Sequence, residues 1–371
     1  MRQGWEIRPF DKCIDKVKYT TKIATCDYST MGAYPIISQE EEYISGYWNN
    51  AEDVFRVSKP VVIFGDHTRV LKYVDFDFVL GADGVKVLQP IDAINAKFFL
   101  YYLTASNIPS LGYSRHYKLL KELNVPVPPI AEQEKIVAEL DCLSSIIEKK
   151  KQQLKELDNL AQSIFYTTFG DPISNNFGWE AKKLSEVCPY ITDGSHYSPK
   201  EDVKGTIPML SVKDMRQSNF SYESCKMIGD EEYQKLLSNG CKPLKDDVLV
   251  AKDGSYFKYI FALKEEREQA LLSSIAIVRP DKSVINPIYL VGYLSTTEIY
   301  NEVEREYLTG TAIKRIILKG LRSMRILLPP LHLQQEFASK IEAIEKQKEL
   351  IRQSIEETET LFNSRMDYYF N

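Results

Sequence analysis

The chain has 371 residues, of which 44% are hydrophobic and 27% charged, an ordinary globular composition that excludes a disordered or fibrous protein. Its length allows two or three domains, and no apolar run approaches the roughly 18 residues that a membrane helix needs. The N-terminal residues lack the apolar segment of a secretion signal, and the six cysteines include no Cys-x-x-Cys pair, so we expect a soluble cytoplasmic protein with reduced thiols.

The net charge of −5 is unevenly distributed along the chain. Residues 1–129 and 170–328 are neutral, with 15 and 22 charges of each sign, whereas 130–169 has 5 basic against 7 acidic residues and 329–371 has 5 against 8. Two neutral regions therefore alternate with two acidic segments. A neutral domain can present a basic face, so the composition leaves DNA binding open without supporting it.

The first neutral region is predicted to be a mixed α/β body. Runs rich in β-branched and aromatic residues predict strands at 61–64, 69–74, 76–80 and 84–88. An amphipathic helix is predicted from Ile94-Asn95 to about Ser106. Glycine-containing loops that are both polar and aromatic are expected at 45–49 and 65–69.

The first acidic segment predicts one long helix, because it contains neither Gly nor Pro up to Phe169. Pro128-Pro129 suits the start of this helix, since the N–H groups that proline lacks would have no intrahelical partner there. Apolar residues follow the 4,3,4,3 spacing of a coiled-coil seam with a single lysine within it. The seam consists of Ile136, Leu140, Leu143, Ile147, Lys150, Leu154, Leu157, Ala161 and Ile164.

The turn Gly170-Asp171-Pro172 leads into a second predicted α/β body. Strands are predicted at 247–251, 259–263 and 273–278, and a helix from Ile285-Asn286-Pro287 to about Tyr300. Polar and aromatic loops are expected at 193–199 and 252–258.

The second acidic segment predicts another long helix with a coiled-coil seam. Its seam residues are Phe337, Ile341, Ile344, Lys348, Ile351, Ile355, Thr358, Phe362 and Arg365. The two helices pair most simply with each other, as an antiparallel pair about 60 Å long at 1.5 Å per residue. The alternative is that each helix packs only on its own domain.

The chain is an internal repeat. Pro128-Pro129 recurs as Pro329-Pro330 at an offset of 201, and nine further residues match at the same offset without a gap. Gly4-Trp5-Glu6 recurs as Gly178-Trp179-Glu180 at an offset of 174, so the second body is 27 residues longer. The residues matched at the offset of 201 are Lys118, Leu120, Gln133, Glu148, Gln152, Glu156, Leu160, Ser163 and Phe169 in the first copy.

These features together resemble the DNA-specificity subunit of type I restriction-modification systems, over the whole chain. The resemblance rests on the alternation of body and helix, the Pro-Pro-x-x-x-Gln start at 128–133, the Asp-Gly-x-His-x-x-Pro loop at 193–199, and Gly310-Thr311-Ala312-Ile313-Lys314. The second helix start keeps its glutamine, Gln334, but has Leu333 where the first copy has Glu132.

The resemblance implies an α/β fold with a pseudo-twofold repeat, in which a long antiparallel two-helix coiled coil separates two target-recognition domains. It places the domains at 1–127 and 170–328 and the spacer helices at 128–169 and 329–371. Each domain would read one half of a bipartite DNA site, and the helices would dock two adenine-methyltransferase subunits, beside restriction or translocase subunits where a system has them. It implies no cofactor or metal on this chain, with S-adenosylmethionine bound by the methyltransferase.

Polar and aromatic loops on a rigid body can enter the major groove, and nearby basic residues can contact phosphates. The predicted DNA contacts are Tyr47, Trp48, His67, Arg69, Arg115, Lys118, Ser195, His196, Tyr197, Lys252, Ser255, Tyr256, Lys258, Lys314 and Arg315, with His116 and Lys121 in the first basic cluster and Lys319, Arg322 and Arg325 in the second. The alternatives are turn-forming residues and a solvated face. Ile146 and Leu350, apolar and off the seam, are the predicted partner contacts.

No residue set predicts catalysis. Asn286-Pro287-Ile288-Tyr289 has Ile288 where an adenine methyltransferase would have a second proline, and the four histidines have no metal-ligand spacing. We therefore expect a non-enzymatic subunit. Two alternatives stay open: the specificity subunit of a related system with other methyltransferase or nuclease partners, and a coiled-coil adaptor that binds protein only.

Overall fold

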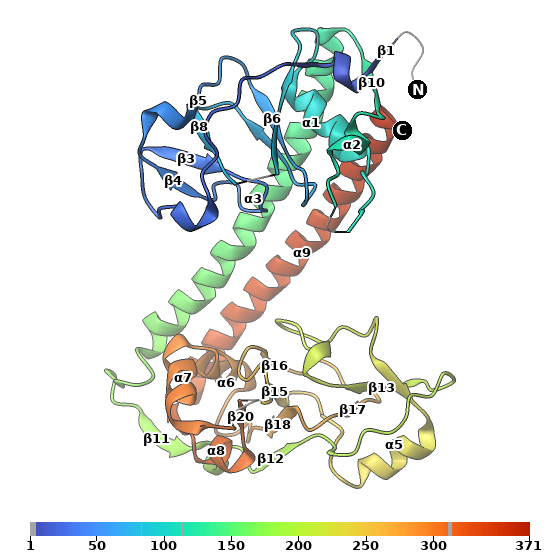
Figure 1. Cartoon of the computed structure of the whole chain (residues 1–371). Coiled ribbons are helices and arrows are strands. Elements are labelled where there is room, and N and C mark those ends of the chain that lie inside the picture. The colour runs from blue at the N-terminus through green and yellow to red at the C-terminus, as the bar shows by residue number, and fades with distance from the viewer. Residues whose placement is uncertain (1–4, 83, 113, 311–313) are drawn as a thin grey trace. The chain divides into compact units, whose positions relative to one another are not determined.

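The computed structural model describes residues 5–82, 84–112, 114–310 and 314–371 (Figure 1). The chain forms two compact units: unit 1 comprises residues 1–151 and 352–371, and unit 2 comprises residues 152–351. Each unit therefore includes a portion of both long helices. The division expected after residues 127, 169 and 328 instead treats each body and each long helix as a separate region. None of the described helices combines the length and the apolar character that a bilayer crossing requires.

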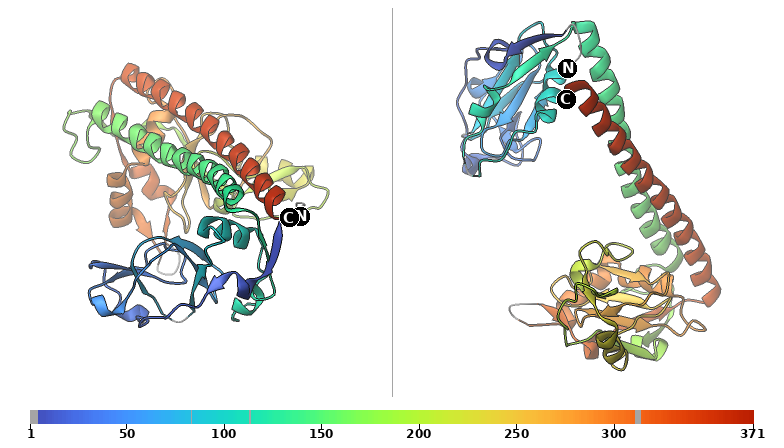
Figure 2. Two further views of the ribbon diagram at one scale, coloured as in Figure 1. Left: turned by 90° about the horizontal axis from the view of Figure 1, so that it is seen from above. Right: turned by 90° about the vertical axis from the view of Figure 1, so that its right-hand side faces the viewer.

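The two long helices are α3 (Ile130–Phe169) and α9 (Leu331–Phe370), each of 40 residues. Every predicted seam residue of both helices is buried or half-buried. In unit 1 Glu139 pairs with Arg365 and Lys150 contacts Ser354, and in unit 2 Asp158 pairs with Lys348 and the rings of Phe165 and Phe337 lie 5.8 Å apart. Residue numbers therefore rise along one helix in the direction in which they fall along the other, and the two helices lie side by side in both views of Figure 2. The antiparallel pairing predicted from the heptads is confirmed.

The body of unit 1 contains two four-stranded sheets and a two-stranded ladder. In the second sheet, β3 (Tyr34–Ile37) and β8 (Phe78–Leu80) pair in parallel while the other strands pair antiparallel. Helix α1 (Ala96–Ala105) packs on β6 (Val61–Gly65) and β7 (Leu71–Val74), and its buried Phe98 and Phe99 enter the core. The ladder is β1 (Glu6–Pro9) with β10 (Asn124–Val127); the first sheet has the order β2 (Ile14–Asp15), β9 (Val85–Pro90), β6 (Val61–Gly65), β7 (Leu71–Val74); the second has the order β4 (Gly46–Trp48), β3 (Tyr34–Ile37), β8 (Phe78–Leu80), β5 (Val54–Phe55).

Unit 2 repeats this plan. It has a ladder, a four-stranded sheet and a second sheet that correspond to those of unit 1. The second sheet again contains a parallel pair, β13 (Ile207–Leu210) with β17 (Ala270–Leu271). The additional length includes helix α5 (Asp230–Leu237). The ladder is β11 (Glu180–Lys183) with β21 (Arg325–Leu328); the first sheet has the order β12 (Tyr190–Asp193), β18 (Ile275–Arg279), β15 (Val248–Ala251), β16 (Ile260–Ala262); the second has the order β14 (Lys226–Ile228), β13 (Ile207–Leu210), β17 (Ala270–Leu271).

Three local predictions were wrong. The helix expected from Ile285 to Tyr300 is two helices, α6 (Pro287–Leu294) and α7 (Thr297–Glu302), because Thr296 is extended and its hydroxyl caps α7 through the N–H of Ile299. The strand expected from Arg69 begins at Leu71, since Arg69 has a left-handed φ of 64°. The loop expected at 45–49 is largely strand β4.

Buried glutamines fix the start of each long helix. Gln133 accepts a hydrogen bond from the N–H of Asn95 and donates to the carbonyl oxygens of Ala93 and Pro128. Gln334 makes the equivalent bonds with the backbone of Asn286, Val284 and Pro329. Asn95 and Asn286 are themselves the N-caps of α1 and α6. The glutamine of the Pro-Pro-x-x-x-Gln motif therefore joins each long helix to the short helix of its own body.

The far end of each long helix packs on the body of the other half of the sequence. Phe370 of α9 lies 5.4 Å from the ring of Phe98 in unit 1, and Phe169 of α3 lies 4.7 Å from the ring of Tyr289 in unit 2. The hydrophobic core of each unit thus includes the end of a long helix from the other half of the sequence.

Candidate nucleic-acid interface

In unit 2 three of the predicted DNA-binding stretches come together. The Lys252 ammonium lies 3.1 Å from a carboxylate oxygen of Asp193, joining loop 252–258 to loop 193–199. The N–H of Gly254 donates to the carbonyl oxygen of Lys314, and the N–H of Ile316 donates to that of Lys252. These contacts form loop cluster 2, defined as 193–199, 252–258 and 314–315. Residues 311–313 of the glycine motif, and Gly4 of the repeated Gly-Trp-Glu marker, lie outside the described residues.

The outer surface of loop cluster 2 carries exposed cationic and aromatic side chains. Tyr197 is 61% exposed, and His196, Lys258, Lys314 and Arg315 are exposed as well. One carboxylate of the cluster, Asp193, is occupied by Lys252 and by the imidazole of His196 at 3.5 Å. The exposed face is therefore available for phosphates and base edges.

The structure corrects two predicted contacts in this cluster. Ser195 is buried, and its hydroxyl donates to the carbonyl oxygen of Tyr197 while accepting from the N–H of the same residue. Lys252 is also buried, held by Asp193 and Asp253. Both residues shape the loops instead of facing solvent, because a buried charge or hydroxyl needs internal partners.

A tyrosine with a carboxylate partner extends loop cluster 2. The hydroxyl of Tyr256 donates to Glu304 at 2.8 Å, and the rings of Tyr256 and Tyr300 stack at 5.9 Å. Hydrogen bonding with Tyr300 and Glu304 raises the pKa of Tyr256 above its usual range, which favours the protonated phenol that donates to Glu304. Glu304 lies on a π-helical turn, Val303–Tyr307, that was not predicted from the sequence. Ser255, the remaining predicted DNA contact of this cluster, is half-buried and donates its N–H to the carbonyl oxygen of Asp253.

Unit 1 contains an equivalent arrangement at the hairpin between β6 and β7. The carbonyl oxygen of Asp66 accepts the N–H of His116, and a carboxylate oxygen of Asp66 accepts the N–H of Tyr117 at 2.7 Å. Loop 65–69 therefore lies against segment 115–118, and together they form loop cluster 1. His116 is completely buried, with Nδ1 at 2.9 Å from the Asp66 carbonyl oxygen, so its predicted phosphate contact was wrong.

Loop cluster 1 presents cations around an aromatic ring. Arg69, Arg115 and Lys118 are exposed, and a guanidinium nitrogen of Arg69 donates to the carbonyl oxygen of Ile108. The ammonium groups of Lys86 and Lys121 lie 5.4 and 5.5 Å from the centre of the Tyr117 ring. Lys86 of β9 was not among the predicted contacts; it lies between the buried Val85 and Val87, and its ammonium group lies 3.7 Å from Asp66.

The remaining predicted contacts of the first body are less exposed. His67 is half-buried, and its N–H donates to the side-chain oxygen of Gln39. Tyr47 and Trp48 belong to the edge strand β4 of the second sheet and are half-buried, with the Trp48 indole N–H donated to Asp53. The structure does not bring Tyr47 and Trp48 to loop cluster 1, because strand pairing directs them into the second sheet.

Both units share one plan, in which the segment that precedes the long helix braces a hairpin loop. The sequence of the chain matches a known family over most of its length. The family model described as the type I restriction modification DNA specificity domain matches residues 4–159 and 176–360. The chain belongs to this family. It is the DNA-sequence-recognition subunit of a type I system, and it is not itself catalytic. Such specificity subunits work with methyltransferase and restriction subunits.

Similar specificity subunits occur in Escherichia coli. That of the type I restriction enzyme EcoR124I/EcoR124II is 22% identical over 375 residues, covering 96% of this chain and 91% of the relative. That of the type I restriction enzyme EcoBI is 22% identical over 334 residues, covering 81% of this chain and 68% of the relative.

Solved structures confirm the fold. The type I restriction-modification S subunit from M. genitalium superposes with a TM-score of 0.61 at 14% identity, covering 98% of this chain and 95% of that one. A chain from a study of complex assembly and conformational transition in a type I restriction-modification system gives a TM-score of 0.54 at 16% identity, covering 100% and 98%. The predicted α/β architecture with paired long helices is thus confirmed for this specificity subunit.

Proposed function

We propose that loop clusters 1 and 2 each read one half of a bipartite DNA site, and that the long helices dock two copies of one adenine-methyltransferase subunit. The hairpins that carry the clusters, β6–β7 and β15–β16, occupy equivalent places in the two sheet orders. Each cluster offers donors for guanine and phosphate. Equivalent readers on two bodies support recognition of two separate half-sites by one chain.

The partner proposal rests on an exposed stripe that is duplicated between the helices. Four residues of α3 in unit 2 recur with identical type, at the offset of 201, on α9 in unit 1. Their spacing of 4, 4 and 3 places each set on one face of its helix. All eight are exposed, with Leu160 at 47% and Leu361 at 49%. The duplicated stripe consists of Gln152, Glu156, Leu160 and Ser163, and of Gln353, Glu357, Leu361 and Ser364.

The duplicated stripe is the observation that carries the proposal. Identity at seam positions would follow from packing, but exposed positions have no packing requirement. Two identical exposed faces, each with a leucine at its centre, suit two copies of the same partner. An apolar anchor within a polar rim is the usual composition of such an interface. S-adenosylmethionine would bind to the docked methyltransferase and not to this chain.

The two partner contacts expected from the sequence are secondary candidates. Ile146 is 37% exposed and Leu350 is 59% exposed, so both are available on the surface of their helices. Their counterparts in the other copy are Gln347 and Lys149, which are not apolar. A contact through Ile146 or Leu350 would therefore differ between the two partner copies.

Charged substitutions at the stripe leucines test this docking. We expect Leu160→Asp to remove one methyltransferase copy, Leu361→Asp to remove the other, and the double variant to remove both, because a carboxylate would be desolvated at the interface. Native mass spectrometry of the co-expressed complex counts the copies. Gln162→Asp and Asn363→Asp are matched controls, since these equivalent exposed residues lie off the stripe. Two copies retained by the double variant would contradict the docking.

A further inference from the structure

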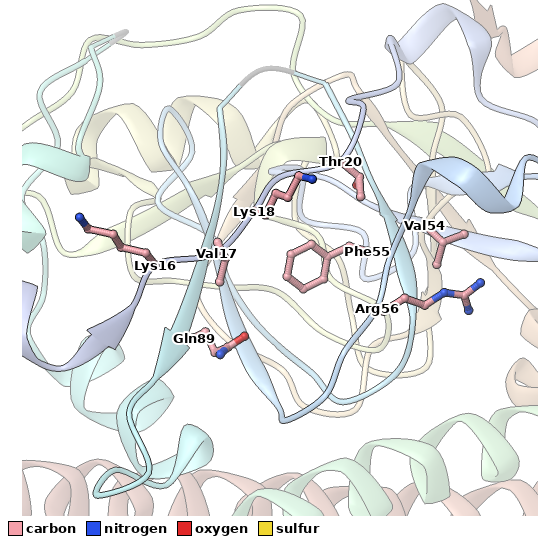
Figure 3. A pocket seen from close by; sticks show the side chains of 8 residues that line it. All are labelled: Lys16, Val17, Lys18, Thr20, Val54, Phe55, Arg56 and Gln89. Carbon is pink, nitrogen blue, oxygen red and sulfur yellow. The ribbon is translucent and has the colours of Figure 1, made fainter.

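A basic pocket in unit 1 lies outside loop cluster 1. It has a volume of about 360 Å³, and its walls include Lys16, Lys18, Thr20, Phe55, Arg56 and Gln89. Figure 3 shows the Phe55 ring at its centre, with Lys16 and Arg56 extending toward opposite sides. Lys16, Lys18 and Arg56 are exposed and form its rim, whereas Phe55 is buried.

The pocket has an excess of positive charge. The neighbouring carboxylates already hold cations, since Asp15 pairs with Lys59 at 2.7 Å and Asp77 pairs with Arg56 at 2.7 Å. Within the described ranges neither Lys16 nor Lys18 has an ion-pair partner. These two ammonium groups therefore remain available to an anion.

The wall also contains a polar group that lacks a partner. The Thr20 hydroxyl oxygen is buried and makes no hydrogen bond within the described part of the chain. A buried hydroxyl without a hydrogen-bond partner destabilises the folded chain. Rotation of the Thr20 side chain would present this hydroxyl to an anionic oxygen at the wall. The Gln89 amide already donates one N–H to Asp15 at 3.5 Å and has a second N–H to offer.

We propose that this basic pocket binds the phosphate backbone of DNA, as a sequence-independent contact separate from the base-reading loops. The inference rests on the proposed function, in which the unit that carries the pocket holds DNA. The cations are distributed around the rim and do not converge on one point, which suits an extended polyanion better than a single small anion. Duplex DNA carries a phosphate about every 3.4 Å along each strand.

Neutralising the two free lysines tests the pocket. The full chain carrying Lys16→Gln and Lys18→Gln is compared with the unchanged chain by fluorescence anisotropy, over a salt series, on a target duplex and on a scrambled one. Each lost phosphate contact lowers the slope of log affinity against log salt by about 0.9, so we expect a decrease near 2 on both duplexes. Affinity at 0.1 M salt should fall at least tenfold. Lys340→Gln with Lys346→Gln, exposed lysines of α9, removes the same charge elsewhere and should leave the slope unchanged.

A third variant separates the pocket from a general charge effect. Thr20→Val keeps the shape of the side chain but removes its hydroxyl, so affinity should fall a few-fold with the slope unchanged. An unaltered slope in the lysine variant, a loss confined to the target duplex, or full affinity in Thr20→Val would each overturn the proposal while the proposed function stands. Failure of the unchanged chain to bind either duplex would instead overturn both.

Discussion

A glutamine side chain at the start of each long helix is completely buried, which is unusual for a polar residue of this size. Gln133 and Gln334 satisfy this burial with three backbone hydrogen bonds each. Two of the bonds go to residues at and just before the N-cap of the neighbouring short helix, and the third goes to the proline carbonyl before the long helix itself. Each side chain thus satisfies backbone groups that helix packing would otherwise leave unpaired.

Removal of one glutamine should destabilise only its own unit. Gln133→Ala leaves the N–H of Asn95 and two carbonyl oxygens without partners, and each unpaired buried group costs about 1–3 kcal/mol. We expect Gln133→Ala to lower the free energy of unfolding of unit 1 by about 3 kcal/mol, and Gln334→Ala to lower that of unit 2 by the same amount. Hydrogen-exchange mass spectrometry would localise the loss to α1 or to α6. The exposed neighbour Gln335→Ala is the control, and equal loss of protection in both units would refute the assignment.

At the scale of the elements, a lysine interrupts the apolar seam of each long helix, and the two are satisfied differently. In unit 1 the Lys150 ammonium donates to the hydroxyls of Ser354 and Thr358 at 2.6 and 3.0 Å. In unit 2 Lys348 is buried and pairs with Asp158 at 2.6 Å and with Glu345 at 2.5 Å. Polar seam residues of this kind fix the register of a coiled coil at a cost in stability.

Reversing the charge of Lys348 should weaken the helix pair in unit 2. Lys348→Glu places a buried carboxylate beside two others, and loss of a buried pair costs about 3–5 kcal/mol. Because the Asp158 side chain is 57% exposed and screened by solvent, we expect a smaller loss, of about 2 kcal/mol. Urea denaturation would measure it. Adding Asp158→Lys should restore part of the stability, whereas Lys346→Glu on the exposed face should have little effect.

At the scale of the whole molecule, the repeat predicts modular reading of DNA. His196→Ala with Tyr197→Ala alters exposed residues of loop cluster 2 alone, and Arg69→Ala with Arg115→Ala alters loop cluster 1 alone. Each base contact discriminates by about 1–3 kcal/mol, so each pair should relax one half-site and leave the other unchanged. Methylome sequencing of cells that carry each variant would show this directly. A uniform loss across both half-sites would show that the clusters do not read separately.

The sequence by itself determined the repeat, both long helices, their seams and the family. These features are periodic or local, and a heptad pattern or a Pro-Pro-x-x-x-Gln start has few structural solutions. Some short strands, such as β4 and β5, escaped prediction because a run of two or three residues is too short to show the alternation of a strand.

Only the tertiary structure decided which candidate side chains face solvent. Ser195, Lys252 and His116 have the polar character of DNA contacts, yet each is buried. Other segments supply the partners of Lys252 and His116, and the hydroxyl of Ser195 bonds within its own loop. The duplicated stripe was already present in the sequence as four matched residues, but its exposure followed only from the packing of α3 against α9. Burial depends on contacts between segments far apart along the chain, and residue type alone does not specify them.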